Sequence, residues 1–345
     1  MKTKHILFSC IMLGAFGLGA QDVHFSQITE TPLLLNPAQA GLGHDVLAII
    51  NYKDQWRSVA SPYKTFNAAA DFALLKQKSG THLGLGVDIF SDKAGDANMG
   101  TTMGQLHVAG IVALNSTNLL SVGVVGGYGQ RSMSMAELTW GNQYDGQQYN
   151  PALNSGEPNT YSNLNYLDAG AGLSWFFSAG HSTLSSNDAK LFNIGAAVHH
   201  LNKPAYSFYG ASTNRLPLKL VFHGNASIGM KNYNLVLEPS YFVALQGAHQ
   251  EITPGMMFKY ILGQSSKYTD RKKSSALSLG AYVRFKDAIV PTARYEFTNW
   301  SIGTSYDVNI SGLTTASRSR GGFEISLRFM TPNPFSKTGS VSSFQ

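Results

Sequence analysis

Hydrophobic and polar side chains alternate along most of this chain with a period of two residues. In one stretch, the apolar and polar rows are Leu277, Leu279, Ala281, Val283 and Phe285 against Ser278, Gly280, Tyr282 and Arg284. The same alternation recurs at positions 83–89, 167–177, 218–223 and 300–309. No helical period competes over a comparable length. Because successive side chains of a β-strand point to opposite faces, the pattern predicts an all-β protein.

Fourteen segments with this alternation are expected to form strands. Their approximate ranges are 45–53, 64–73, 82–91, 101–114, 118–131, 163–177, 190–200, 217–230, 233–243, 249–262, 274–285, 287–296, 299–309 and 321–330. An even number of antiparallel strands, each of about ten residues, is what a single-chain outer-membrane β-barrel needs. The segments therefore predict a transmembrane barrel of about 14 strands.

Short and long connections alternate between these segments, as in a barrel with short turns at its periplasmic end. The short ones lie at 115–117, 231–232 and 298, and the long ones at 54–63, 92–100, 132–162, 201–216 and 310–320. The exceptions are the long links 178–189 and 263–273 and the single-residue link at Lys286. The alternation favours a membrane barrel over a soluble sandwich.

The charged residues within these segments fall on one face of each strand. The last segment alternates Phe323, Ile325, Leu327 and Phe329 with Glu324, Ser326 and Arg328. A charge facing lipid near the bilayer midplane costs about 2–4 kcal/mol, so the charged face is expected to line the lumen. By the same parity, the lumen-facing charges are Asp88, Asp168, Lys219, Arg284, Arg294, Glu296, Asp307, Glu324 and Arg328.

The composition and the N-terminus fit export to a membrane. Only 13% of the 345 residues are charged, against about 25% in ordinary soluble proteins. A basic start, an apolar run over 6–18 and small residues at Gly19-Ala20 predict a signal peptide over residues 1–20. Cys10, the single cysteine, lies within it, so the mature chain is expected to have no disulfide. Loss of Lys2 and Lys4 with the signal peptide lowers the net charge from +6 to 6 − 2 = +4. That charge is too small to indicate nucleic acid as a partner, and export argues against one as well.

The remaining chain divides into three expected regions. Residues 21–44 carry prolines and a mixed pattern that does not make a strand, so a short plug inside or beneath the lumen is expected. Residues 45–330 are expected to form a monomeric transmembrane β-barrel. Residues 331–345 are expected to form a periplasmic tail.

Sequence motifs of catalysis are missing. The chain has no G-x-S-x-G elbow, no phosphate-binding loop and no H-E-x-x-H pair, so no enzyme, cofactor or metal site is predicted. His199 and His200 are neighbours on an expected strand, so their rings should point to opposite faces and could not share a metal. The 132–162 loop holds Trp140 among other aromatic and amide side chains. It is either a recognition surface or a cover for the barrel mouth.

Several boxes along the chain together resemble a known family. They are Gln21-Asp22-x-His24-Phe25-Ser26-Gln27, Leu35-Asn36-Pro37-Ala38-x-Ala40-Gly41, Asn51-Tyr52-Lys53-Asp54-Gln55-Trp56, Gln130-Arg131-Ser132, Leu138-Thr139-Trp140-Gly141-Asn142-Gln143 and Gly321-Gly322-Phe323-Glu324-Ile325-Ser326-Leu327. Their order and spacing are similar to those of the PorP/SprF proteins of the Bacteroidetes type IX secretion and gliding system. The resemblance implies a non-enzymatic outer-membrane barrel that associates with secretion components in the periplasm and outer membrane. It also implies that the barrel helps export, or anchors, a secreted surface protein such as an adhesin, bound through its C-terminal sorting domain.

The residues expected to contact such a partner come from the lumen, the plug and the loops. They are Asn36, Pro37, Trp56, Asp88, Arg131, Trp140, Arg284, Arg294, Asp307, Glu324 and Arg328. The rival hypothesis is a passive outer-membrane channel, because Asn36-Pro37-Ala38 is also similar to a box in the fatty-acid transporter family. A channel for hydrophobic solutes should have an apolar lumen, whereas the charged face of the strands predicts a polar one.

Overall fold

The computed structural model describes residues 22, 24–57, 61–134, 138–156, 163–179, 182–183, 186–187, 189–208, 214–263, 274–312 and 314–331. The predicted signal peptide, residues 1–20, and the predicted tail beyond residue 331 lie outside these ranges. No helix in the described part of the chain combines the length and apolar character that crossing a membrane requires.

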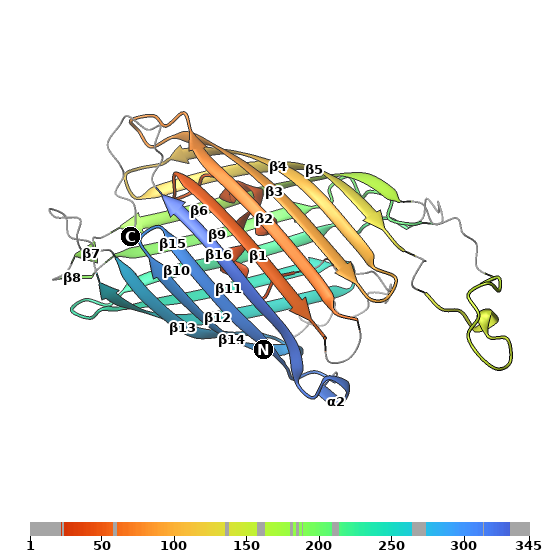
Figure 1. Ribbon diagram of the computed structural model, residues 1–345. Helices are drawn as coiled ribbons and strands as arrows, with labels where there is room; N and C mark the ends of the chain where they lie inside the picture. The colour runs from red at the N-terminus through yellow and green to blue at the C-terminus, as the bar shows by residue number, and fades with distance from the viewer. Residues whose placement is uncertain are drawn as a thin grey trace, which may run out of the picture.

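Fourteen antiparallel strands close into one barrel (Figure 1). They are β1 (Val46–Gln55), β2 (Tyr63–Leu74), β3 (His82–Ala94), β4 (Met99–Ala113), β5 (Asn118–Ser132), β6 (Leu164–Ala179), β9 (Lys190–His199), β10 (Lys219–Gly229), β11 (Leu235–Gln246), β12 (His249–Gly263), β13 (Ser275–Arg284), β14 (Ala288–Phe297), β15 (Trp300–Asn309) and β16 (Arg320–Thr331). Each strand pairs with its neighbour along the chain, and β1 pairs with β16 to close the ring. All fourteen predicted strands are confirmed, with ends that move by a few residues.

Two elements of the connections were not predicted. The 178–189 link contains a two-stranded ribbon, β7 (Ser182–Thr183) with β8 (Ser186–Asn187). A short helix, α2 (Thr314–Ser317), lies between β15 and β16. We call the end of the barrel where β1 begins the turn end. The opposite end, which carries the β5–β6 and β9–β10 connections, is the loop end.

The burial of the strands follows the predicted alternation. On β16, Ile325 is 41% exposed on the outer surface, whereas Glu324 beside it is 1% exposed. Large apolar side chains are exposed in the same alternating way on β3, β6 and β13. The outward apolar residues form a band suited to contact with the lipid hydrocarbon of a membrane. The inward residues do not face lipid and can therefore be polar.

The segment before β1 lies inside the barrel, and we call its described residues, 22 and 24–44, the plug. It contains two 3₁₀ turns, η1 (Ile28–Glu30) and η2 (Pro37–Gln39), around a single helical turn, α1 (Pro32–Leu35). Pro32 and Pro37 each open their turn, where the missing N–H of proline costs no hydrogen bond. Asn36 caps η2 by accepting a hydrogen bond of 2.9 Å from the N–H of Ala38.

Glycines on the inner wall let the plug approach the strands closely. A Cβ added to Gly84 on β3 would lie 1.9 Å from the carbonyl oxygen of Ala40. A Cβ on Gly172 of β6 would lie 1.9 Å from Asn36 Oδ1. Backbone and side-chain atoms of the plug therefore occupy the space that strand side chains would fill elsewhere.

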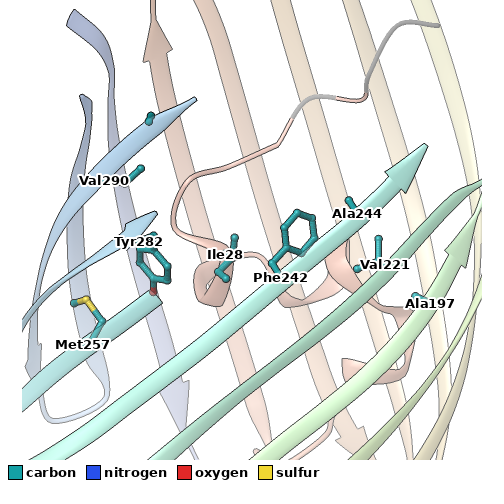
Figure 2. Close-up of a cluster of buried hydrophobic side chains, with 9 residues drawn as sticks. Ile28, Ala197, Val221, Phe242, Ala244, Met257, Tyr282 and Val290 are labelled. Atoms are coloured by element: carbon teal, nitrogen blue, oxygen red, sulfur yellow. The ribbon is translucent and has the colours of Figure 1, made fainter. Parts of the chain in front are cut away.

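The lumen also contains apolar side chains, so its polarity is mixed rather than polar throughout. Ile28 of the plug packs in a buried cluster with inward residues of β10, β11 and β13, among them Val221, Phe242 and Tyr282 (Figure 2). Leu33 anchors a second buried cluster with Ile111 and inward residues of neighbouring strands. The positions of the charged residues along the strands could not reveal these apolar patches. The patches cover apolar side chains of the plug, whose location the strand pattern does not give.

Candidate functional site

The inner wall at the loop end binds the start of the plug through a cationic pair. Arg284 Nη2 donates to Asp307 Oδ2 at 2.8 Å, and Lys53 Nζ lies 3.5 Å from the same oxygen. Lys53 also donates to Ser26 Oγ at 2.9 Å, and Arg284 Nη1 donates to His24 Nε2 at 3.0 Å. Burial and the neighbouring cations hold the pKa of His24 well below its ordinary value, so the ring is neutral and accepts this hydrogen bond.

Glu324 on β16 holds the next plug residues. Its carboxylate accepts the backbone N–H groups of Ser26 at 2.7 Å and Gln27 at 2.9 Å. Ser326, on the same face, donates to Gln27 Oε1 at 3.0 Å. Hydrogen bonds to a charged acceptor are stronger than neutral ones, so this carboxylate fixes the backbone of the plug.

A second ion-pair network surrounds Glu30 in the middle of the lumen. Glu30 Oε1 lies 3.1 Å from Arg328 Nη1 and 3.4 Å from Arg294 Nη1. Both guanidinium groups also contact Glu296 Oε1, at 3.3 Å from Arg328 and 2.9 Å from Arg294. Glu238 pairs with Arg294, and Lys259 pairs with Glu296. Three cations thus meet three carboxylates, one of which belongs to the plug.

The first described residue of the plug is held at the loop end by His200. Its Nε2 lies 2.8 Å from Asp22 Oδ2, and its Nδ1 lies 3.0 Å from Asp168 Oδ1. Burial disfavours the charged ring, but the hydrogen bonds to both carboxylates outweigh it and raise the pKa of His200 to about 9. Burial likewise opposes ionisation of Asp22, but Lys219 and His200 hold its pKa below the ordinary value.

The prediction that the His199 and His200 rings point to opposite faces is wrong. Strand β9 ends at His199, and His200 has a φ of +59°, which breaks the alternation. Both rings are buried inside the barrel, 6.4 Å apart between centroids, and His199 Nε2 lies 3.2 Å from the carbonyl oxygen of Leu35. Among the residues that the structure describes, no three His, Cys, Asp or Glu side chains gather as a metal site.

The Asn36-Pro37 box lies against β5, β6 and β9. Asn36 Nδ2 donates to the carbonyl oxygen of Leu173 at 3.0 Å and lies 3.1 Å from His223 Nε2. Beside it, Ser121 Oγ donates to the carbonyl oxygen of Ala38 at 2.7 Å. The Asn36-Pro37-Ala38 segment therefore fixes the plug against these strands.

The other four predicted site residues have partners outside the described part of the plug. Asp88 is 1% exposed, its hydrogen-bond partner is Asn67, and its Oδ1 has no partner among the described residues. The Arg131 guanidinium lies 4.0 Å above the Tyr206 ring, so it fastens the β9–β10 connection over the loop end. Trp56 lies at the β1–β2 rim, with its ring edge-on to that of Tyr63 at 4.9 Å.

Trp140 lies in the β5–β6 connection, where its backbone N–H donates to Gln143 Oε1 at 3.2 Å. The structure thus brings seven of the eleven predicted residues together around the plug: Asn36, Pro37, Arg284, Arg294, Asp307, Glu324 and Arg328. Asp88, Arg131, Trp56 and Trp140 lie apart from them. Whether any of the eleven contacts a partner stays a prediction.

Sequence reasoning missed several members of these networks, among them Glu238, Lys259, Glu30 and His200. Glu238 and Lys259 occupy inward positions that the parity of β11 and β12 would have revealed. Glu30 and His200 carried no such signal, because one lies in an irregular segment and the other follows a strand end with a positive φ.

A cavity of about 140 Å³ lies between the plug and the strands β1, β9 to β11 and β16. Leu35, Leu47 and Ile49 line it together with polar groups that include His223 and Arg328. The cavity is large enough for a small apolar group or a few waters.

Several solved outer-membrane proteins are distantly similar in structure to this barrel. It resembles the Ralstonia pickettii toluene transporter TbuX (11% identity over 88% of this chain and 94% of that chain, TM-score 0.45) and Haemophilus ducreyi BamA lacking POTRA domains 1–3 (9% identity, 83% and 70%, TM-score 0.38). CdiB from Acinetobacter baumannii is similarly distant (7% identity, 83% and 60%, TM-score 0.38). Likenesses this weak carry no argument about function.

Among curated proteins, no sequence matches this chain. The family model described as type IX secretion system membrane protein PorP/SprF matches residues 18–329. The resemblance in the sequence is therefore confirmed, and the chain belongs to the PorP/SprF family of outer-membrane barrels of the type IX secretion system.

Proposed function

We propose that this protein is a plugged, non-conducting barrel that docks a secreted cargo protein at the bacterial outer membrane. The observation that carries the proposal is the plug, whose start, middle and Asn36 box are each bonded to different strands of the inner wall. Cargo would be held at the loop end, facing outward, and would not pass through the lumen. The role is non-enzymatic.

The ion pairs make the plug hard to displace. Removing it would leave Glu324, Arg294 and Arg328 short of the partners that Ser26, Gln27 and Glu30 supply. Breaking one buried ion pair by losing a partner costs about 3–5 kcal/mol. A lumen closed in this way suits an anchor better than a conduit.

The predicted partner-binding residues then divide into two groups. Those bonded to the plug, such as Glu324 and Arg328, would act on a partner only by fixing the plug. Those at the loop end, such as Trp56, Arg131 and Trp140, would meet the C-terminal domain of a cargo directly. Other type IX components would contact the turn end from the periplasm, on the side of the proposed tail at 331–345. The proposed signal peptide, residues 1–20, directs export.

The rival function, a channel for small hydrophobic solutes, draws support from the partly apolar 140 Å³ cavity beneath the plug. A measurement of ionic conductance distinguishes the channel function from the docking function. Purified protein is inserted in planar bilayers beside a variant lacking residues 24–42. We expect no steady current from the wild type and a large one from the variant, because the plug fills the lumen. Steady wild-type conductance would replace the docking proposal with the channel.

A further inference from the structure

The connection between β5 and β6 carries a self-contained surface at the loop end. We call its described residues, 138–156, the knob, and Figure 1 shows it beyond the ends of the two strands. It contains a 3₁₀ turn, η3 (Gly141–Gln143), and an isolated bridge between Tyr144 and Tyr149. A loop of this length usually has a function of its own when it is ordered.

Hydrogen bonds within the knob fix its backbone. The N–H of Asn150 donates to the carbonyl oxygen of Gln143 at 2.8 Å, and Gln143 Nε2 donates to the carbonyl oxygen of Leu153 at 3.3 Å. Asp145 Oδ1 accepts the N–H groups of Gln147 at 2.9 Å and Gln148 at 2.8 Å. Gln143, which ties the two halves together, is buried. The knob is therefore shaped before any partner arrives, which lowers the entropic cost of binding.

The exposed surface of the knob carries three large hydrophobic side chains among uncharged polar ones. Tyr144 is 59% exposed, Tyr149 46% and Leu153 38%. Asp145 is the single charged residue from Leu138 to Gly156, and its carboxylate is engaged in the local turn. These side chains lie beyond the strand ends, so burial in lipid does not account for their exposure.

We infer that the knob is the surface that holds the cargo, and that it recognises an uncharged, partly apolar protein surface through Tyr144, Tyr149 and Leu153. Rigid tyrosines set among Asn, Ser and Gly are the composition of antibody paratopes, where the rings supply contact area and the small polar residues adaptable hydrogen bonds. Leu153 offers a sugar neither a flat ring nor a hydrogen bond, which favours protein over glycan. The inference rests on the proposed docking function and names its contact surface.

The test measures binding of a purified C-terminal sorting domain, taken from a type IX cargo of the same bacterium, to the full-length barrel in mild detergent. The double variant Tyr144→Ala/Tyr149→Ala keeps every backbone, Gln143 and Asp145 hydrogen bond of the knob. We expect its affinity to fall at least about tenfold, because exposed aromatic anchors dominate interfaces. The matched control is Tyr233→Ala, since Tyr233 is a 66% exposed tyrosine at the turn end.

Salt provides a second readout. Binding should change little up to about 1 M salt, where the Debye length is only about 3 Å, because the knob contributes almost no charge. Wild-type affinity in the double variant, or a steep fall of wild-type affinity with salt, would overturn the inference and leave the docking function standing. Absence of binding by the wild-type barrel would instead overturn the docking function. Binding of lipopolysaccharide vesicles that is lost in the double variant, without binding of the sorting domain, would show a glycan surface.

Discussion

Asp307 and Asp88 are both buried carboxylates on the inner face of the barrel, but their surroundings differ. Asp307 receives a hydrogen bond from Arg284 and lies beside Lys53. Asp88 has an amide partner, Asn67, and one oxygen without a partner among the described residues. A buried charge is tolerated when a cation compensates it and is costly when none does.

Neutralising these two carboxylates should therefore affect the free energy of unfolding differently. Asp307→Asn should lower the free energy of unfolding by roughly 3 kcal/mol, since it leaves two buried cations short of a partner. Asp88→Asn should change it by less than about 1 kcal/mol or raise it, because the amide loses little and the burial of a charge is avoided. Urea unfolding of the purified barrels, followed by the mobility shift of the folded form on gels, measures both. Equal losses would contradict this account.

His200 gives the plug a dependence on pH. The groups that face it are Asp168 of β6, Asp22 of the plug, His199 at the end of β9, and Lys219, which bonds the same Asp22 carboxylate. Because its pKa is raised from 6.5 to about 9, its contribution to stability is complete below pH 6.5. That contribution is lost as the pH rises through about 9.

The variant His200→Gln isolates this contribution. The stability difference between wild type and variant should be largest below pH 6.5 and should disappear above about pH 9. Asp22, whose pKa is lowered, stays ionised throughout this range and does not reverse the trend. Unfolding midpoints across the range test the sign, and a difference that grows with pH would refute the assignment.

At the level of elements, the plug is a set of short turns whose shape depends on the strands around it. Its two 3₁₀ turns and one helical turn are too short to be stable alone. They persist because Gly84 leaves room for the plug backbone at Ala40, Gly172 leaves room for the Asn36 side chain, and the wall supplies hydrogen bonds. The same glycines sit within strands, where they would otherwise weaken the sheet.

A single methyl group added to Gly84, where β3 contacts the plug, should displace the plug. Gly84→Ala would place a Cβ 1.9 Å from the carbonyl oxygen of Ala40, so the plug must shift, at a cost of about 1–3 kcal/mol. Gly110→Ala on β4 is the control, since nothing lies within 4 Å of its added Cβ. We expect a lower unfolding midpoint and leak currents in Gly84→Ala alone. Identical behaviour of the two variants would show that the plug does not rest on this glycine.

At the scale of the whole molecule, the barrel followed from the alternation of the strands, but the contents of its lumen did not. Outward residues such as Ile325 all face the same lipid hydrocarbon, so the alternation of apolar and polar residues is enough to predict their positions. Inward residues meet an irregular plug. Glu324 is polar because it binds two backbone N–H groups, whereas Phe242 is apolar because it packs against Ile28. These choices depend on contacts between distant segments, which no local period records.

The plug also bears on how the ring closes during folding. Lys53 of β1 and Glu324 of β16 face each other in register where the first and last strands meet, and both bond to Ser26. The bond between Ser26 and Glu324 spans 298 positions, so forming it closes nearly the entire chain into one loop, an entropically slow event. Ser26 lies close in sequence to β1 and can already be bound there when β16 arrives. The plug thus offers the last strand a prepared docking point, and couples the kinetics of barrel closure to the element that afterwards fills the pore.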